Sequence, residues 1–295
     1  MRFLDHQASP AEIRRHGEAL GAIFDIWALR TGDRWRHEAV IRGLCQTAYL
    51  GDHTAICRIL GRYKMYVDTR DVGVASHLML DGYWEMWNTE TIIRLVRPGM
   101  TVLDVGAHCG YFSVLLADLV GPTGKLLSFE PNPPMAELLR RTIAVNGFDG
   151  RTTVHEIALG QERGTATLEV PKNEPKNAHV VQGKGGPGTV EVPLRRGDEI
   201  PGALDADFIK IDAEGAEQAI WTGLADILVR NRPLTILLEF AAARYADPAA
   251  FLSQILSHGF DLAEVDLVGG VQPRSRADVL NASPHDDQML LLTRS

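Results

Sequence analysis

Two acidic residues in the middle of the chain, Asp104 and Glu130, are placed where they could bind a small ligand. Asp104 comes just before a turn that contains Gly106 and Gly110, and Glu130 directly follows the next predicted strand. A carboxylate beside the turn suits a cationic group such as an ammonium, whereas a carboxylate at a strand end can accept hydrogen bonds from both hydroxyls of a ribose. We therefore predict a site for a ligand that carries both groups.

The same turn distinguishes between two nucleotide ligands. A dinucleotide fingerprint requires G-x-G-x-x-G, because its second glycine lets the backbone approach the pyrophosphate. His108 occupies that second position, and the carboxylate of Asp104 would repel an anionic pyrophosphate. The residues therefore favour S-adenosylmethionine over NAD, and a dehydrogenase is the less favoured alternative.

The elements that position these residues form a strand–helix–strand unit. A buried strand is predicted over 101–105, a helix with apolar residues at helical spacing over 111–120, and a second strand over 125–129. In such a unit the helix amides face a ligand at the carboxyl ends of parallel strands. Further strands are predicted over 152–157, 207–212, 234–240, 260–265 and 288–293. Helices are predicted over 135–145, after Glu217 through Leu228, and over 249–258.

A second group of acids follows the later strands. Asp212 and Glu214 come at the end of one predicted strand, and Glu239 comes at the end of the next. We expect these carboxylates to point into one crevice, because the carboxyl ends of parallel strands meet at one edge of a sheet. With His285 in a later loop, they are the candidate catalytic residues, since a carboxylate or an imidazole can remove a proton from an acceptor.

Three stretches of the sequence together resemble one protein family. They are Asp81-Gly-Tyr-Trp-Glu85, the run VLDVGAHCGYFS over 102–113 with its continuation FEPNP over 129–133, and DFIKIDAEGAE over 207–217. As a set they resemble the FkbM family of class I S-adenosylmethionine-dependent methyltransferases, over roughly residues 66 to 240. The resemblance implies an α/β, Rossmann-like class I methyltransferase fold. Its sheet would be mostly parallel and seven-stranded with an antiparallel edge, and a helical N-terminal extension would precede it.

The resemblance also implies a set of cofactor contacts. Glu85 would contact the methionine end of S-adenosylmethionine, and Ala158 and Leu159 would pack against the adenine. S-adenosylhomocysteine would be the product. The remaining expected contacts come from the turn, from the residues around the second strand and from the fourth strand: Asp104, Gly106, Ala107, His108, Gly110, Tyr111, Glu130, Pro131, Asn132 and Asp212.

The residues leave the need for a metal open. The turn over 106–111 is similar to that of catechol-type O-methyltransferases, which hold Mg²⁺ with ligands that match Asp212 and Glu239. The adjacent third ligand would fall on Phe240, which cannot bind a metal. We therefore favour a metal-free reaction in which a carboxylate or His285 is the base.

The domain organisation is predicted from the changes in pattern along the chain. Residues 1–62 are expected to form a helical cap, with helices over 34–50 and 54–60, and a homodimer could form through these helices. Residues 63–295 would form the methyltransferase domain, with an inserted strand pair and loop at about 161–200. The tract 171–188 is either a lid or a passive surface loop, and 269–287 would be a loop beside the substrate site.

Composition limits the partners and the location of the protein. The 295 residues carry a formal net charge of −8, which gives no electrostatic reason to expect nucleic acid or an anionic membrane as a partner. No apolar run reaches the ~20 residues that would span a bilayer. Three cysteines fit neither a disulfide framework nor a zinc site. We therefore expect a cytoplasmic protein.

The expected reaction follows from the resemblance. The chain would be an O-methyltransferase that acts on a hydroxyl of a small molecule, such as a sugar, a polyketide or another secondary metabolite. Two alternatives are an N-methyltransferase of a small-molecule amine and a non-catalytic S-adenosylmethionine-binding partner protein.

Overall fold

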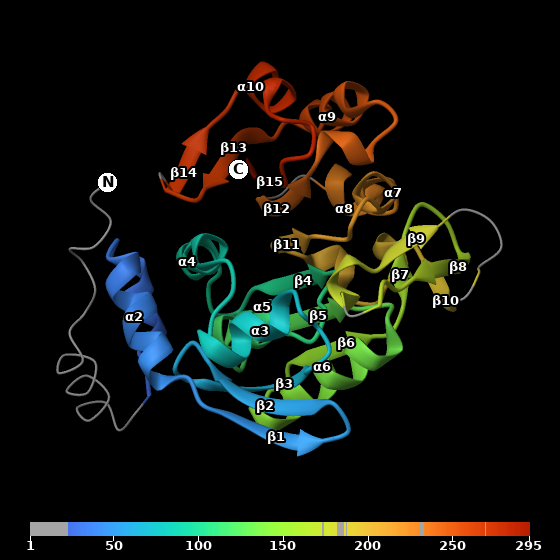
Figure 1. Ribbon diagram of the computed structural model, residues 1–295. Coiled ribbons are helices and arrows are strands. Elements are labelled where there is room, and N and C mark those ends of the chain that lie inside the picture. Colours follow the sequence, from blue (N-terminus) through green and yellow to red (C-terminus); the bar gives the residue numbers. More distant parts are fainter. Residues whose placement is uncertain (1–22, 173, 182–185, 187, 231–232, 269) are drawn as a thin grey trace.

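The architecture is seen in a computed structural model of the chain (Figure 1). The structure describes residues 23–172, 174–181, 186, 188–230, 233–268 and 270–295. The first part of the predicted helical cap, residues 1–22, lies outside the described residues. Among the helices of the described part, none is long and apolar enough to cross a membrane.

An eight-stranded sheet forms the centre of the fold, in the order β14-β13-β15-β12-β11-β4-β5-β6. Strands β12, β11, β4, β5 and β6 run parallel, whereas β15 is antiparallel to both of its neighbours. The predicted α/β fold with an antiparallel edge is confirmed, and β14 adds one strand to the seven expected. The strands are β4 (Thr101–Val105), β5 (Lys125–Phe129), β6 (Thr152–His155), β11 (Phe208–Ile211), β12 (Leu234–Phe240), β13 (Asp261–Asp266), β14 (Gly270–Pro273) and β15 (Gln288–Arg294).

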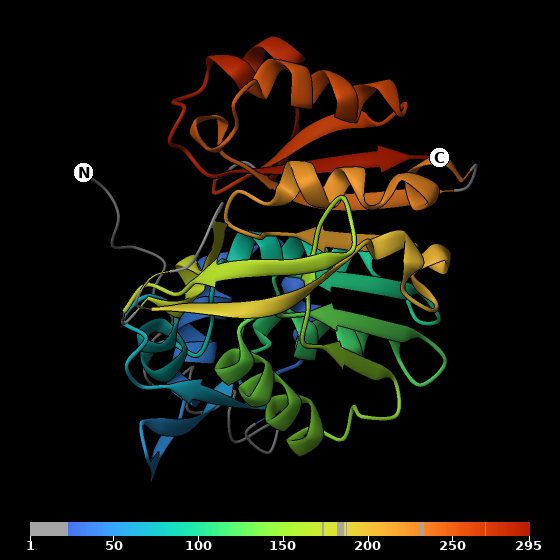
Figure 2. The same ribbon diagram turned by 90° about the vertical axis from the view of Figure 1, so that its right-hand side faces the viewer.

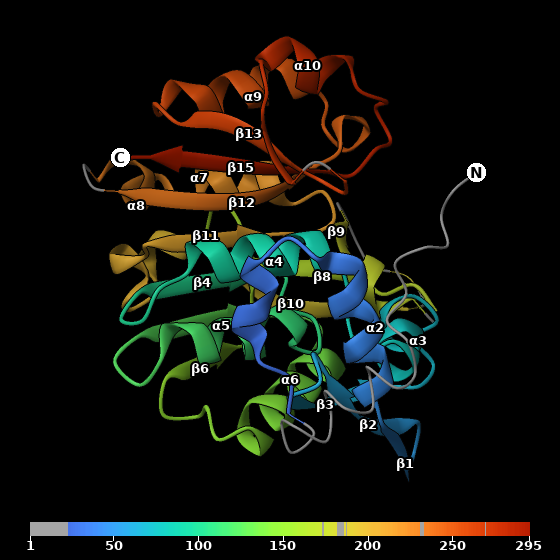
Figure 3. The same ribbon diagram turned by 90° about the vertical axis from the view of Figure 1, so that its left-hand side faces the viewer.

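Helices cover both faces of this sheet. Strand residues alternate between the two faces, so that Val102 packs in one core with α4, α5 and α6, and Leu103 packs in the other with α7, α8 and α9. Figure 3 shows α4 and α5 on the first face. The helices are α3 (Val74–Leu80), α4 (Met86–Leu95), α5 (Tyr111–Val120), α6 (Pro133–Val145), α7 (Glu217–Thr222), α8 (Ala225–Val229) and α9 (Pro248–Ser257), with short 3-10 turns η3 (Gly197–Glu199), η4 (Ala203–Asp205) and η5 (Ala242–Arg244).

The N-terminal region is less helical than predicted. After η1 (Ile26–Arg30), helix α2 (Arg34–Leu44) ends six residues before the predicted 50, because β1 (Thr47–Gly51) follows it. The helix predicted over 54–60 is wrong. This segment is β2 (Thr54–Ile59), which buries every second residue and pairs with β1 and with β3 (Tyr63–Asp68).

The three-stranded sheet packs beside α6, at the bottom of Figure 1. The amide of Tyr66 in β3 donates to Thr142 Oγ1 of α6 at 3.1 Å, and the Lys64 amide donates to Asn146 Oδ1 at 3.1 Å. This sheet continues across the predicted boundary between residues 62 and 63. The division of the chain into a cap and a methyltransferase domain remains a prediction.

The inserted segment at 161–200 contains the predicted strand pair. Strands β8 (Gly164–Glu169) and β10 (Thr189–Arg195) are antiparallel and cross the side of the molecule that faces the viewer in Figure 2. Two further strands extend the pair, β7 (Ala158–Leu159) beside β10 and β9 (His179–Val181) beside β8. Strand β9 and the turn η2 (Pro175–Asn177) lie within the tract that was predicted as a loop.

The predicted loop over 269–287 also has secondary structure. It contains β14, which pairs with β13, and helix α10 (Arg276–Asn281). A capping box starts this helix, because Ser275 Oγ accepts from the Asp278 amide and Asp278 Oδ2 accepts from the Ser275 amide.

Candidate functional site

A cavity of about 320 Å³ opens at the carboxyl ends of β4, β5, β11 and β12. This is the position at which open α/β sheets bind their ligands. Most of the residues predicted as cofactor contacts or catalytic residues line the cavity: Glu85, Gly106, Ala107, His108, Tyr111, Glu130, Pro131, Ala158, Leu159, Asp212, Glu214 and Glu239. The other four, Asp104, Gly110, Asn132 and His285, are not among its lining residues.

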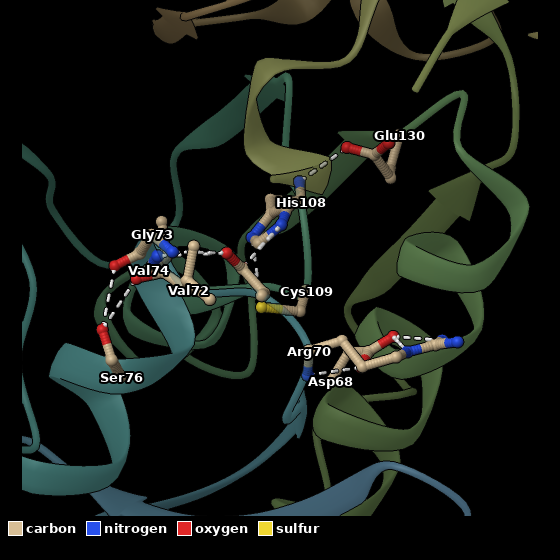
Figure 4. Close-up of polar contacts among 10 residues, drawn as sticks. Asp68, Arg70, Val72, Gly73, Val74, Ser76, His108, Cys109 and Glu130 are labelled. Atoms are coloured by element: carbon tan, nitrogen blue, oxygen red, sulfur yellow. Dashed lines mark hydrogen bonds and ion pairs between the residues drawn. The ribbon is translucent and has the colours of Figure 1, made fainter. Parts of the chain in front are cut away.

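Glu130 is held rigidly at the end of β5. Its Oε2 accepts from the His108 amide at 2.7 Å (Figure 4). Its Oε1 accepts from the Asn132 amide at 2.8 Å. The side chain is buried, and burial raises its pKa to about 7. Each oxygen can still accept a second hydrogen bond. The carboxylate therefore fits a pair of ribose hydroxyls, and Asn132 acts on it from outside the cavity.

The turn after β4 needs its glycines for packing. Gly106 has a φ of +79°, and a Cβ at this position would lie 1.7 Å from the carbonyl oxygen of Asp212. Gly110 precedes α5 with a φ of +100°, and a Cβ there would lie 2.6 Å from Leu139 Cδ1. A side chain at either position would disturb the turn itself, so neither substitution could test ligand contact.

His108 joins this turn to the loop before α3. Its Nδ1 lies 3.2 Å from Cys109 Sγ, and its Nε2 lies 3.6 Å from Asp71 Oδ2. The other oxygen of Asp71 accepts from the Gly73 and Val74 amides at the start of α3. Burial lowers the pKa of His108, so the ring is held as a neutral wall of the cavity.

Three residues other than glycine that line the cavity have left-handed backbone conformations. The φ angles are +39° at Glu85, +50° at His108 and +50° at Glu214. Such residues cost about 1–3 kcal/mol each and gather at functional sites. Glu85 directly precedes α4 and accepts from Asn88 Nδ2 at 2.8 Å. Burial and Asp212 raise its pKa to about 7.

Asp104 does not face the cavity, where a contact with a ligand's ammonium group was predicted. It is fully buried (0% exposed), accepts from Ser113 Oγ at 2.6 Å and lies beside Lys210 in the register of β4 and β11. It therefore balances the charge of Lys210 inside the protein. The geometry does not support its prediction as a partner of a ligand's ammonium group.

Lys210 is a buried cation in the middle of the site. It is 1% exposed, its Nζ donates to Asp212 Oδ2 at 2.9 Å, and it lies 4.8 Å from the centroid of the Phe112 ring. Burial alone would lower its pKa, but Asp212 and Asp104 raise it above the usual range. Lys210 thus fixes Asp212 at the edge of the cavity.

The structure brings the predicted acids of the later strands together. Oxygens of Asp212, Glu214 and Glu239 lie within 4.8 Å of one another. Burial raises the pKa of Glu214 to about 7, and burial together with Asp212 raises that of Glu239 to about 9. His285, in contrast, is exposed on the C-terminal loop and outside this group, so the geometry does not support it as a base.

Oxygen ligands of this kind suit a hard divalent cation, but here they already have cationic partners. Arg244 donates to Glu239, and its Nη2 lies 2.9 Å from Glu214 Oε2 and 3.0 Å from Asp287 Oδ1. Asp212 is bonded to Lys210. A metal ion would have to displace these side chains, so the arrangement does not fit Mg²⁺.

The sequence patterns did not indicate the two basic residues, although each has a readable signal. Lys210 is a charged residue inside an otherwise apolar strand, Phe208–Ile211, and a buried charge requires a partner. Arg244 follows Glu239 by five residues, and the turn η5 brings it back to that strand end. Asn88 and Lys176 also line the cavity and were not predicted.

The structure combines a central parallel sheet, a glycine turn, a fixed carboxylate that fits a ribose and a nearby cluster of acids. This combination is typical of the methyltransferase class of α/β proteins. The FkbM methyltransferase domain matches residues 104–262, which is more than half of the chain. The chain therefore belongs to the FkbM family of S-adenosylmethionine-dependent methyltransferases, as the sequence predicted.

Curated relatives match over shorter stretches. A protein-L-isoaspartate O-methyltransferase of Methanothrix thermoacetophila is 46% identical over 48 residues, 16% of this chain and 23% of its own length. The catechol O-methyltransferase of Mus musculus is 27% identical over 120 residues, 40% of this chain and 42% of its own length. The chain thus spans less than half of either relative. A solved SAM-dependent O-methyltransferase of Thermotoga maritima aligns with 81% of this chain and 77% of its own, at 13% identity and a TM-score of 0.41.

Proposed function

We propose that this protein transfers a methyl group from S-adenosylmethionine to a hydroxyl of a small molecule. One observation carries the proposal: a single cavity has Glu130 on one side and the carboxylates of Asp212, Glu214 and Glu239 on the other. The first side fits the ribose of the cofactor. The second side can take the proton that a hydroxyl acceptor must lose on methylation. A protein that only binds the cofactor would have no need for such a group of carboxylates.

When bound, S-adenosylmethionine supplies a methyl group that its positive sulfonium already activates. The protein's own part is to hold the acceptor in line with this methyl, to exclude water, and to accept the hydroxyl proton on a carboxylate. Glu214 suits the last role, because its pKa of about 7 lies near a physiological pH and only its Oε2 is bonded to Arg244. A methyl ether and S-adenosylhomocysteine would leave, and the proton would pass from Glu214 to water.

Two measurements test this function. Calorimetry should show binding of S-adenosylmethionine and none of NAD. A panel of hydroxyl and amine acceptors should then yield S-adenosylhomocysteine and a methylated product with a hydroxyl compound. Methylation of amines alone would support the N-methyltransferase alternative, and binding without turnover on any acceptor would support a non-catalytic role.

The Glu130→Ala variant should bind S-adenosylmethionine about 1.5–3 kcal/mol more weakly, the scale of a lost hydrogen bond to a charged group. The reason is that the ribose hydroxyls would lose the carboxylate that accepts their hydrogen bonds, while the amides of His108 and Asn132 would stay in place. Calorimetry on the folded variant measures the change. An affinity equal to that of the wild type would remove Glu130 from the cofactor site.

One wall of the cavity comes from the inserted segment. Residues 175–180 line the cavity, with the Lys176 Nζ 5.9 Å from the centroid of the Trp84 ring. Strand β9 lies at the end of the small sheet and pairs only with β8 among the described strands. A segment held by one strand pair opens more readily than a core strand. We propose that residues 174–181 act as a lid, which is one of the two predicted alternatives, the other being a passive surface loop.

If so, amide hydrogen exchange over 174–181 should slow about tenfold or more when S-adenosylhomocysteine and an acceptor are both bound, because closure protects these amides. Mass spectrometry measures this exchange. The control is the segment 261–268, which does not line the cavity. Its amides should exchange at the same rate with and without the ligands. Equal exchange over 174–181 with and without ligands would favour the passive loop.

A further inference from the structure

The acid cluster contains a cation supplied by the chain itself. The guanidinium of Arg244 lies between three carboxylates: it donates to Glu239, and it is 2.9 Å from Glu214 and 3.0 Å from Asp287. The side chains of Arg244, Glu214 and Glu239 are 23%, 22% and 11% exposed, so water screens the contacts among them little, whereas the side chain of Asp287 is 55% exposed. Three unbalanced carboxylates as close as these would repel one another strongly.

We propose that Arg244 takes the place that a divalent cation would occupy in this cluster, and that it positions Glu214 and Glu239 for a reaction that needs no metal. This inference rests on the proposed methyl transfer. A guanidinium is planar, permanently charged and carries donors in a fixed fork, so it can hold several carboxylates in one arrangement. Phe240 stands where a third metal ligand would be expected, so the positive charge among these carboxylates comes from Arg244 instead.

The remaining carboxylate of the cluster is engaged in the same way. Asp212 is bonded to Lys210, which is 1% exposed and enclosed by Phe112 and Asp104. The cluster therefore has one cation for Asp212 and one shared by Glu214, Glu239 and Asp287. A metal ion that used all three of Asp212, Glu214 and Glu239 would have to displace both.

The proposal predicts that removing Arg244 creates a metal site. Electron paramagnetic resonance would measure Mn²⁺ binding by the wild type and by the variants R244A and R244K. R244A should bind Mn²⁺ at least about tenfold more tightly than the wild type, because the carboxylates lose their cation. R244K keeps a positive charge and should bind Mn²⁺ as weakly as the wild type.

The matched control is R274A. Arg274 pairs with Glu264 at 2.7 Å, with 35% of the arginine side chain and 20% of the glutamate side chain exposed, and neither residue lines the cavity. R274A should therefore leave Mn²⁺ affinity unchanged. Adding E214Q and E239Q to R244A should abolish the gained affinity, which would locate the new site at the cluster. If R244A does not fold, R244Q removes the charge and keeps most of the side chain.

Turnover gives a second readout. EDTA should leave the wild type active, and R244A should lose about 100-fold in turnover, the scale of misplaced catalytic groups. Equal Mn²⁺ affinity in wild type and R244A, or a wild type stopped by EDTA and restored by Mg²⁺, would overturn the proposal. The titration needs neither cofactor nor acceptor, so a failure of the proposed methyl transfer would be seen separately, as absent S-adenosylmethionine binding or turnover.

Discussion

The Glu214→Gln variant should lose about 10²–10⁴-fold in kcat while its affinity for S-adenosylmethionine stays nearly constant, because an amide cannot take the acceptor's proton. The wild-type rate should rise with pH through about 7, the pKa of Glu214, since the base must first lose its own proton. Groups that face this carboxylate are Arg244, Lys176, Asp212 and Asp287. The variant should lack this ionisation in its pH–rate profile.

Glu264→Gln is the matched control for this measurement. Glu264 is 20% exposed and paired with an arginine, just as Glu214 is 22% exposed and paired with Arg244, but it lies outside the cavity. Its kcat and pH profile should equal those of the wild type. If E214Q kept both its rate and the ionisation near pH 7, the base would be another group that lines the cavity.

The Lys210→Met variant should lose about 3–5 kcal/mol in the free energy of unfolding, the scale of a broken buried ion pair. The methionine fills most of the space, but Asp104 and Asp212 remain without their cation. Burial keeps the pKa of Asp104 above its usual 3.8. The ionised carboxylate therefore destabilises the variant above its folded-state pKa, and the loss should shrink as the pH falls towards 3.8.

Denaturant unfolding at several pH values measures this loss. Lys125→Met is the control, since Lys125 also belongs to a strand of the central sheet but is exposed, and it should change stability by less than about 0.5 kcal/mol. Adding Asp104→Asn to Lys210→Met should recover part of the loss. If K210M changed stability no more than K125M does, the ion pairs of Lys210 with Asp104 and Asp212 would not contribute to stability.

The parts of the fold that could be predicted from sequence are those whose local pattern agrees with their burial. The unit from Thr101 to Phe129 has apolar strands, a glycine turn and an apolar helix, and its boundaries are as predicted. Segment 54–60 was mistaken for a helix although Ala55, Cys57 and Ile59 are the buried residues. A period of two over so short a segment leaves helix and strand ambiguous, and pairing with β1 and β3 decides for the strand.

The site could be predicted in part for a similar reason. Position at the ends of parallel strands placed Asp212, Glu214 and Glu239 together. The sequence can mark Lys210 as a charge inside an apolar strand and Arg244 as a basic residue near Glu239. It could not give their partners, which depend on the register of Lys210 with Asp104 and on the path of the chain after β12. The sequence likewise predicts Asp104 as a ligand contact, because spacing does not show that Lys210 lies beside it on the neighbouring strand.

The left-handed residues Glu85, His108 and Glu214 have a consequence for the thermodynamics of binding. All three conformations are part of the folded backbone, so the free energy that they cost belongs to folding. A ligand that enters a cavity with its walls already set loses less to the ordering of the protein than one that must arrange them. We therefore expect the entropy of cofactor binding to be governed by water released from the cavity and by closure of residues 174–181, with little contribution from the turns themselves.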